Sequence, residues 1–198
     1  MRGAFTKYPD DMVDTVQLNA GFITDDFDPD TLEIGNILGA TADGITFASN
    51  PTFEDFGADV DNVPPNTWQL KRLQSWNPTC SGTYKTMTQD LGRDMLGAGA
   101  FGTSGSTVDK VHIIPADKLT ASDFKDVWIL GDYSAANVGT GAGYMAIHLK
   151  NALNDTGFQW KTNKDGKADF AFNYRAHYDL SSPDDPPFEI YIKPGTAA

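Results

Sequence analysis

A long alternation of apolar and polar residues near the C-terminal end of the chain constrains the fold more than any other feature. In residues 167–180 every second side chain is apolar: Ala168, Phe170, Phe172, Tyr174, Ala176, Tyr178 and Leu180. Successive side chains of a β-strand point to opposite faces, so a period of two over this length predicts one long strand with a packed face. The preceding segment 157–162 and the turn 163–166, which ends in Asp-Gly, predict a hairpin with that strand.

Further strand signals predict that antiparallel strands dominate the fold. One hairpin is expected between 37–41 and 45–48 across Ala42-Asp43-Gly44, and another between 126–133 and 144–149 across a glycine-rich loop. The remaining extended segments are expected at 17–24, at 68–87 with a bend near Pro78, at 108–114 and at 188–193. Short strands separated by Gly and Pro are typical of a β-sandwich or barrel, so we expect a single, mostly β domain over residues 1–198.

One helix is expected beside these strands. Thr88 is a capping residue, Leu91 and Met95 lie four apart on one helical face, and Gly97 follows the last turn, so residues 88–97 predict a short amphipathic helix that flanks the sheet. Residues 120–124 predict a further helical turn. The expected order is an N-terminal arm with the first strands in 1–44, then the helix, then the C-terminal strands in 107–193.

The charge of the chain argues against one class of partner. Its 198 residues hold 15 Lys and Arg against 27 Asp and Glu, which gives a net charge of −12. A duplex-binding surface needs clustered cations that release phosphate counterions, so static binding to nucleic acid is not expected. The acidity is uneven, because residues 1–66 contain 13 acidic side chains and only Arg2 and Lys7 as cations.

Part of this acidity lies in the segment 51–66, which connects two predicted strands. Such a long connection is uncommon unless it is functional or disordered. It also contains Phe53, Phe56, Val60 and Val63, and a solvated linker does not need these apolar side chains. We interpret the segment as an arm that contacts another molecule; the alternative is that its apolar side chains pack on their own domain.

Signals for catalysis are weak. His112, His148 and His177 each lie in a strand pattern and share no metal-ligand spacing, so we expect strand-surface or core positions for them. Cys80 is the only cysteine, and a buried position in a strand is a better interpretation than a nucleophile. The chain lacks both Gly-x-Ser-x-Gly and a P-loop lysine. We therefore expect no enzyme activity and no cofactor.

The sharpest metal candidate is the segment 26–33, whose acids echo the first half of a calcium loop. Thr31 stands where such a loop needs Gly, and Ile37 stands where it needs Glu, so solvated acids are a better interpretation than a calcium site. Neither a signal segment near Met1 nor an apolar run of the ~20 residues that cross a bilayer is visible. We expect assembly inside a cell and no membrane partner.

Several stretches resemble the major tail proteins, or tail tube proteins, of long-tailed phages and related prophages. The stretches that carry the resemblance are 50–66, 122–128 with 131–134, 146–153 and 170–178. The resemblance implies a structural virion protein: a β-sandwich flanked by a helix, six copies in a ring, and rings stacked into a hollow tube that conducts DNA during ejection. It also implies assembly in the cytoplasm of a bacterial host and a final place in the tail tube of the virion.

In that family a long loop between two early strands reaches the neighbouring subunit or ring, and residues 51–66 occupy the matching place. We therefore expect the intersubunit contact to involve Phe53, Phe56, Asp59, Val60, Asp61, Val63, Pro64 and Pro65. Basic residues on the receiving side are expected at Lys71, Arg72, Arg93 and Lys110. The resemblance also implies a tape measure protein, a tail terminator and a distal tail protein as partners, with DNA only as a transient passenger in the lumen.

A carbohydrate- or ligand-binding β-sandwich is the alternative function. It is motivated by four tryptophans and the Asp-rich loops, although core or interface packing accounts for the tryptophans more simply. The four are Trp68, Trp76, Trp128 and Trp160. A hydrolase that uses two of the carboxylates is a further possibility, but no residue pair identifies itself as acid and base.

Overall fold

The computed structural model of the chain describes residues 16, 21–97, 100–102, 110–112, 119–132, 143–164 and 166–193. For 100–102 and 110–112 it describes the backbone alone. Residues 1–15 and 17–20 of the predicted N-terminal arm and first strands lie outside the described residues, as do 108–109, 113–114 and 133 of the other predicted strands.

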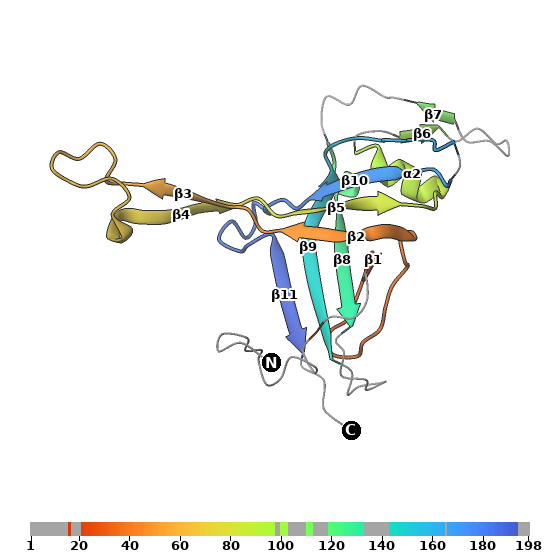
Figure 1. Cartoon of the computed structure of the whole chain (residues 1–198), viewed down its shortest axis with the longest axis horizontal. Coiled ribbons are helices and arrows are strands. Elements are labelled where there is room, and N and C mark those ends of the chain that lie inside the picture. The colour runs from red at the N-terminus through yellow and green to blue at the C-terminus, as the bar shows by residue number, and fades with distance from the viewer. Residues whose placement is uncertain are drawn as a thin grey trace, which may run out of the picture.

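The main sheet has seven antiparallel strands in two halves (Figure 1). The first half contains β1 (Phe22–Thr24), β8 (Lys125–Asp132), β9 (Tyr144–Asn154) and β11 (Phe188–Lys193). The second contains β2 (Thr41–Ala48), β5 (Thr79–Tyr84) and β10 (Phe170–Arg175). The last residues of β9 pair with β10 and join the halves, whose strands cross one another in Figure 1. The predicted mostly β, antiparallel fold is confirmed, and the sheet is not closed into a barrel.

Two small sheets and one helix complete the described structure. Strands β3 (Pro51–Asp55) and β4 (Lys71–Trp76) form one two-stranded sheet, and β6 (Ala100–Gly102) and β7 (Lys110–His112) form the other. The α-helix is α2 (Gln89–Met95), and the short 3₁₀ turns are η1 (Trp68–Leu70) and η2 (Ala121–Asp123).

The predicted helix is confirmed together with its caps. The Thr88 hydroxyl accepts a hydrogen bond from the Leu91 N–H at 3.2 Å, and Leu91 and Met95 are buried against the sheet. Gly97 has a φ of +72°, and a Cβ at this position would lie 2.2 Å from the carbonyl oxygen of Asn154. The helix therefore ends where only glycine fits. The predicted helical turn at 120–124 is η2, which is closed by a capping box between Thr120 and Asp123.

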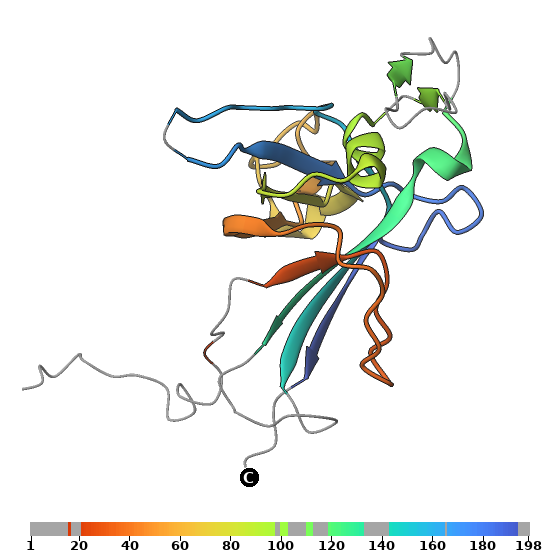
Figure 2. The ribbon, with the colours of Figure 1, turned by 90° about the vertical axis from the view of Figure 1, so that its right-hand side faces the viewer.

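Strands β8 and β9 place alternate side chains in two apolar clusters, one on each face. The main core lies between the two halves of the sheet and α2, and its larger members are Ile23, Tyr84, Leu91, Met95, Val127, Ile147, Leu149, Phe172 and Tyr174. The second cluster covers the opposite face and contains Phe27, Trp128, Leu130, Tyr144 and Ala146. It is closed by the segment 25–38, which runs along that face in Figure 2.

The hairpin predicted within 37–48 is wrong. Asp43 and Gly44 adopt left-handed conformations, with φ of 61° and 81°, but they form a bulge inside the single strand β2. The register moves from Ala42 opposite Thr83 to Ile45 opposite Gly82, so the strand continues along β5 on both sides of the bulge. The sequence correctly indicated left-handed conformations at Asp43 and Gly44. Because the residues on both sides pair with β5, these conformations form a bulge and not a hairpin turn.

The strand predicted over 167–180 is shorter than its alternation suggests. Only residues 170–175, which form β10, pair in a ladder. Their partner strand β5 extends only from Thr79, opposite Arg175, to Tyr84, opposite Phe170. The hairpin predicted with 157–162 is reduced to one bridge between Lys161 and Asp169. The hairpin of β8 with β9, the strand β11 and the bend at Pro78 are confirmed, and this bend separates β4 from β5, which belong to different sheets.

Asn154 links the helix to both halves of the sheet. This side chain is 2% exposed, and its amide donates to the carbonyl oxygens of Met95 at 2.7 Å and Gly157 at 3.1 Å. Its oxygen accepts from the Asn173 N–H at 3.0 Å and from the Thr156 hydroxyl at 3.1 Å. A buried polar group without a hydrogen-bond partner lowers the stability of the fold. The network therefore favours the one position of α2 in which all these hydrogen bonds form.

We predict that Asn154→Ala lowers the free energy of unfolding by about 3 kcal/mol, because it removes a buried donor and a buried acceptor together. Chemical denaturation followed by circular dichroism measures the loss. The exposed Gln159→Ala is the control and should change stability by less than about 0.5 kcal/mol. An equal effect of the two substitutions would contradict a structural role for the network.

Candidate interaction surface

A projecting hairpin, which we call the arm, consists of residues 51–76. It contains β3, the loop with η1, and β4, and Figure 1 shows it extending from the body on the side away from α2. The predicted long loop at 51–66 is therefore a strand in its first five residues, paired with β4 from Pro51 opposite Trp76 to Asp55 opposite Lys71. Trp76 anchors the base of the arm. Its backbone N–H donates to the Tyr178 hydroxyl at 2.9 Å, and its ring lies edge-on to the ring of Phe188.

Asp55 organises the tip of the arm. Its carboxylate accepts the N–H of Asn66 at 2.9 Å and the N–H of Gly57 at 3.0 Å, and thereby ties both ends of the loop together. These two hydrogen bonds hold the pKa of Asp55 below its usual value, and the bond from Asn66 has the larger effect. Asn62 and Asn66 supply the left-handed conformations that the turns need, with φ of 64° and 59°.

The arm exposes five large apolar side chains. Their exposed fractions are 52% for Phe53, 54% for Phe56, 52% for Val60, 80% for Trp68 and 47% for Leu73. Burial of each in an interface is worth about 1 kcal/mol or more. A two-stranded hairpin alone is only marginally stable in water, so an arm of this composition is suited to contact with a second molecule.

The structure brings together the eight residues predicted for the intersubunit contact, since all of them lie in the arm. Val63 is the most sheltered of the four apolar ones and packs beside Gly57, where an added Cβ would meet it at 3.1 Å. The prediction missed Trp68 and Leu73 as members of this surface. The signal was present, because both are apolar residues just beyond 66, but their segment was interpreted as one strand of the body.

The described structure does not bring the four predicted basic residues together on one surface. Lys71 and Arg72 belong to the arm itself, where the Lys71 Nζ lies 5.2 Å from the ring centroid of Phe53 and the Arg72 guanidinium lies 5.0 Å from that of Phe56. Arg93 lies on α2 and pairs with Asp90 at 3.5 Å. Lys110 lies in β7, where only the backbone is described. Cross-strand pairing with β3, which the sequence pattern did not show, places Lys71 and Arg72 next to the aromatic residues of the arm.

His148 and Cys80 lie in strands, as the sequence predicts, whereas His177 lies just beyond the end of β10. The His148 ring stacks on that of Trp128, with 4.0 Å between the ring centroids, and its Nε2 lies 3.1 Å from the Asp126 carboxylate. The Nδ1 of His177 lies 3.0 Å from the Asn151 carbonyl oxygen. The His112 side chain lies outside the described residues. Cys80 is fully buried in β5, and burial raises its pKa to about 12, so this thiol is not a nucleophile at neutral pH.

In the segment 26–33, Asp28 stabilises a turn through its carboxylate. The Asp28 carboxylate accepts the N–H groups of Asp30 at 2.8 Å and Thr31 at 3.3 Å, and these bonds lower the pKa of Asp28. The Tyr144 hydroxyl donates to the carbonyl oxygen of Pro29 at 3.0 Å and fastens the turn to β9. Across the described part of the chain, no cluster of three or more His, Cys, Asp or Glu side chains is arranged to hold a metal ion.

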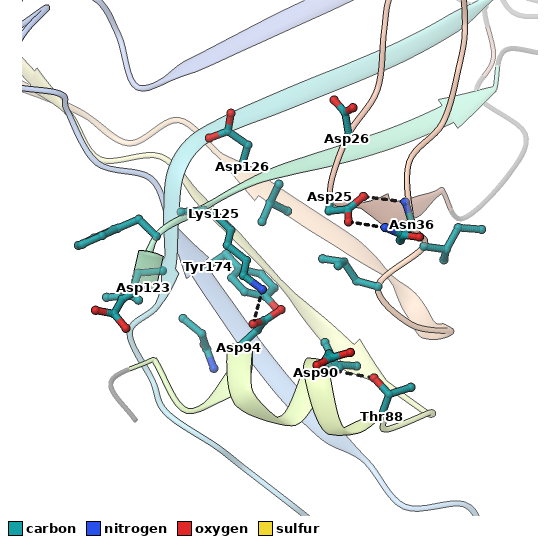
Figure 3. A pocket seen from close by; sticks show the side chains of 18 residues that line it. Asp25, Asp26, Asn36, Thr88, Asp90, Asp94, Asp123, Lys125, Asp126 and Tyr174 are labelled. Carbon is teal, nitrogen blue, oxygen red and sulfur yellow. Dashed lines mark hydrogen bonds and ion pairs between the residues drawn. The ribbon is translucent and has the colours of Figure 1, made fainter. Parts of the chain in front are cut away.

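An acidic cleft of about 920 Å³ lies between α2, β8, β9 and the segment 25–38 (Figure 3). Its carboxylates come from Asp25, Asp26, Asp90, Asp94, Asp123 and Asp126. Asp25 is held by two hydrogen bonds from Asn36, and Asp94 pairs with Lys125 at 2.6 Å. A cleft with this charge repels phosphate groups.

None of the helices in the described residues has the length or the apolar character needed to span a bilayer. No protein-family model matches the chain, and no curated protein does.

We predict that the tip of the arm loosens as pH falls. Because the folded pKa of Asp55 lies below its ordinary value of 3.8, its two hydrogen bonds stabilise the tip at neutral pH and are lost as pH falls through the lowered pKa. In unassembled protein, the NMR shifts of the Gly57 and Asn66 amides should titrate together with a midpoint below 3.8. Asp55→Asn should abolish both titrations. A midpoint at or above the ordinary value would contradict the geometry.

Proposed function

We propose that this chain is a structural subunit that assembles with copies of itself through the arm, as a tail tube protein does. The observation that carries the proposal is the arm itself, which exposes five large apolar side chains on a hairpin that makes few contacts with the body. Its base is fixed by Trp76 and its tip by Asp55. An arm with a preformed shape loses less conformational freedom when it binds a neighbour.

Open sheet edges support assembly into rings. The main sheet ends at β2, at β11 and at β1, which is itself bridged to Ile37. The side chains of Ile190 and Ile192 on β11 are 45% and 61% exposed. Unpaired strand edges invite further pairing, and a repeated head-to-tail contact between identical subunits closes into a ring when its rotation allows. Six copies per ring and stacking of the rings into a tube belong to the proposal through the resemblance.

The charge of the chain is compatible with a conduit for DNA. A net charge of −12, with the acidic cleft on the surface, disfavours adhesion of phosphate groups while DNA passes. The proposal thus places the protein in the tail tube of a virion, without enzyme activity. A tape measure protein inside the tube and terminator and distal tail proteins at its ends are the proposed partners.

The carbohydrate- or ligand-binding alternative rests on exposed tryptophans. Trp68 and Trp160 are 80% and 64% exposed, whereas Trp128 is buried and Trp76 is packed at the base of the arm. The two exposed rings lie on separate projections, the arm and the hairpin 157–169. Calorimetry with glycans tests the alternative: saturable binding that Trp160→Ala removes would favour it over self-assembly.

We predict that loss of the arm abolishes assembly and leaves the body folded. Pro51 and Trp76 are register partners, so residues 52–75 can be replaced by an Asn-Gly turn that closes the remaining strand ends. Electron microscopy of concentrated wild-type protein should show rings or tubes, and the shortened protein should show neither. Its circular dichroism spectrum should retain the strand signal.

A matched pair of substitutions separates surface chemistry from the presence of the arm. Phe56→Ser with Val60→Ser removes apolar contact area and should weaken assembly, whereas Gln69→Ser alters an exposed polar residue of the same arm and should not. Rings formed equally well by the shortened protein, or wild-type protein that stays monomeric under all salt conditions, would refute the proposed function.

A further inference from the structure

We propose that the arm of one copy docks on a basic, aromatic hairpin of a second copy. This hairpin consists of the described residues 157–164 and 166–169, and we call it the Lys hairpin. The inference rests on the proposed function and specifies the receiving surface. Lys71, Arg72 and Arg93 have partners within their own chain, so among the described side chains we looked for the cations that meet the acidic arm in another part of the fold.

The Lys hairpin carries cations that form no close ion pair within the described structure, although Lys161 interacts electrostatically with Asp169. Lys161, Lys164 and Lys167 are exposed, and none forms an ion pair with a described carboxylate. The other lysines and arginines with described side chains have partners in the same chain. These partnerships are Lys85 with Asp169, Arg93 with Asp90, Lys125 with Asp94, Lys150 with Glu189, Arg175 with Asp155, and ring contacts of Lys71, Arg72 and Lys193.

Apolar surface accompanies these cations. Phe158 is 42% exposed and Trp160 is 64% exposed, on the segment that precedes the lysine-bearing turn. The hairpin is held in place by the paired backbone bonds between Lys161 and Asp169, at 2.8 and 2.9 Å, and by the ion pair of Asp169 with Lys85. It thus presents two aromatic rings and three ammonium groups from a fixed base.

The arm presents the complementary chemistry. Glu54, Asp59 and Asp61 are exposed and form no ion pair with a described cation, and they lie among Phe53, Phe56 and Val60. Opposite charges interspersed with apolar groups on both partners give orientation as well as attraction. In the interface, the aromatic and aliphatic side chains supply contact area, and the carboxylate–ammonium pairs at its rim set the register.

The contact requires two copies. Figure 1 shows the arm extending away from the body on the side opposite α2, and Figure 2 shows the Lys hairpin projecting beside β10, so one chain does not bring its own arm to its own hairpin. An interface between two different surfaces of identical subunits is heterologous and propagates from copy to copy. A ring or a stack of rings can grow from this single contact.

Charge reversal on each side tests the contact. Lys164→Glu with Lys167→Glu should raise the protein concentration at which rings or tubes form by about tenfold or more, and Asp59→Lys with Asp61→Lys should do the same, because two favourable rim pairs become repulsive. The four substitutions together should restore assembly to within about threefold of wild type. The effects of the one-sided variants should shrink at high salt.

Asp30→Lys with Glu33→Lys, at two exposed acids that belong to neither the arm nor the Lys hairpin, is the control and should assemble like wild type. Sedimentation and electron microscopy measure assembly, and circular dichroism confirms that each variant is folded. One-sided variants that assemble like wild type, or a combined variant that is not rescued, would overturn the contact.

Two further outcomes separate the proposals. If the shortened protein without the arm fails to assemble while Lys164→Glu with Lys167→Glu assembles normally, the receiving surface is wrong and the proposed function stands. If the wild type never assembles, both fail. Salt-sensitive binding of duplex DNA that the lysine substitutions abolish, with assembly unchanged, would assign the Lys hairpin to DNA and overturn the contact.

Discussion

The pairing of β9 with three neighbours is the constraint on which the rest of the structure depends. Along one edge β9 pairs with β8, and along the other it pairs first with β11 and then, through Asn154, with β10. One strand therefore belongs to both halves of the sheet and fixes how they face each other over the core. Asn154 lies at this junction and also binds the last turn of α2, so the position of the helix follows from the course of the same strand.

The body and the arm are stabilised in different ways. The body closes two apolar clusters on the faces of β8 and β9 and satisfies its buried amide groups internally. The arm is held by one carboxylate at its tip and one tryptophan at its base, and it leaves its aromatic residues in solvent. Such a division suits a subunit that folds alone and completes its apolar contacts only on assembly. It also explains why Lys71 and Arg72 cover aromatic rings within the arm.

Apart from Asp43 in β2, the acids in the described part of the N-terminal third lie in two places. One group of acids lies in the segment 25–38, where Asp25 and Asp28 accept hydrogen bonds that shape turns. A second group lies in the arm, where Asp55 organises the tip and Glu54, Asp59 and Asp61 stay exposed. The strong charge asymmetry in the sequence is thus partly structural and partly a surface property. In the proposed contact, the exposed acids of the arm face the lysines of the Lys hairpin.

The sequence by itself determined the features that depend on neighbours along the chain. It specified the capped helix at Thr88, the hairpin of β8 with β9 and the apolar arm, because caps, turns and side-chain alternation act over a few residues. Only the tertiary structure decided how far β10 extends, that Asp43 and Gly44 form a bulge rather than a turn, and that β4 pairs with the arm. The length of a strand and its bulges depend on which distant strand has unpaired backbone N–H and C=O groups. The residues of a strand do not by themselves determine which strand pairs with it.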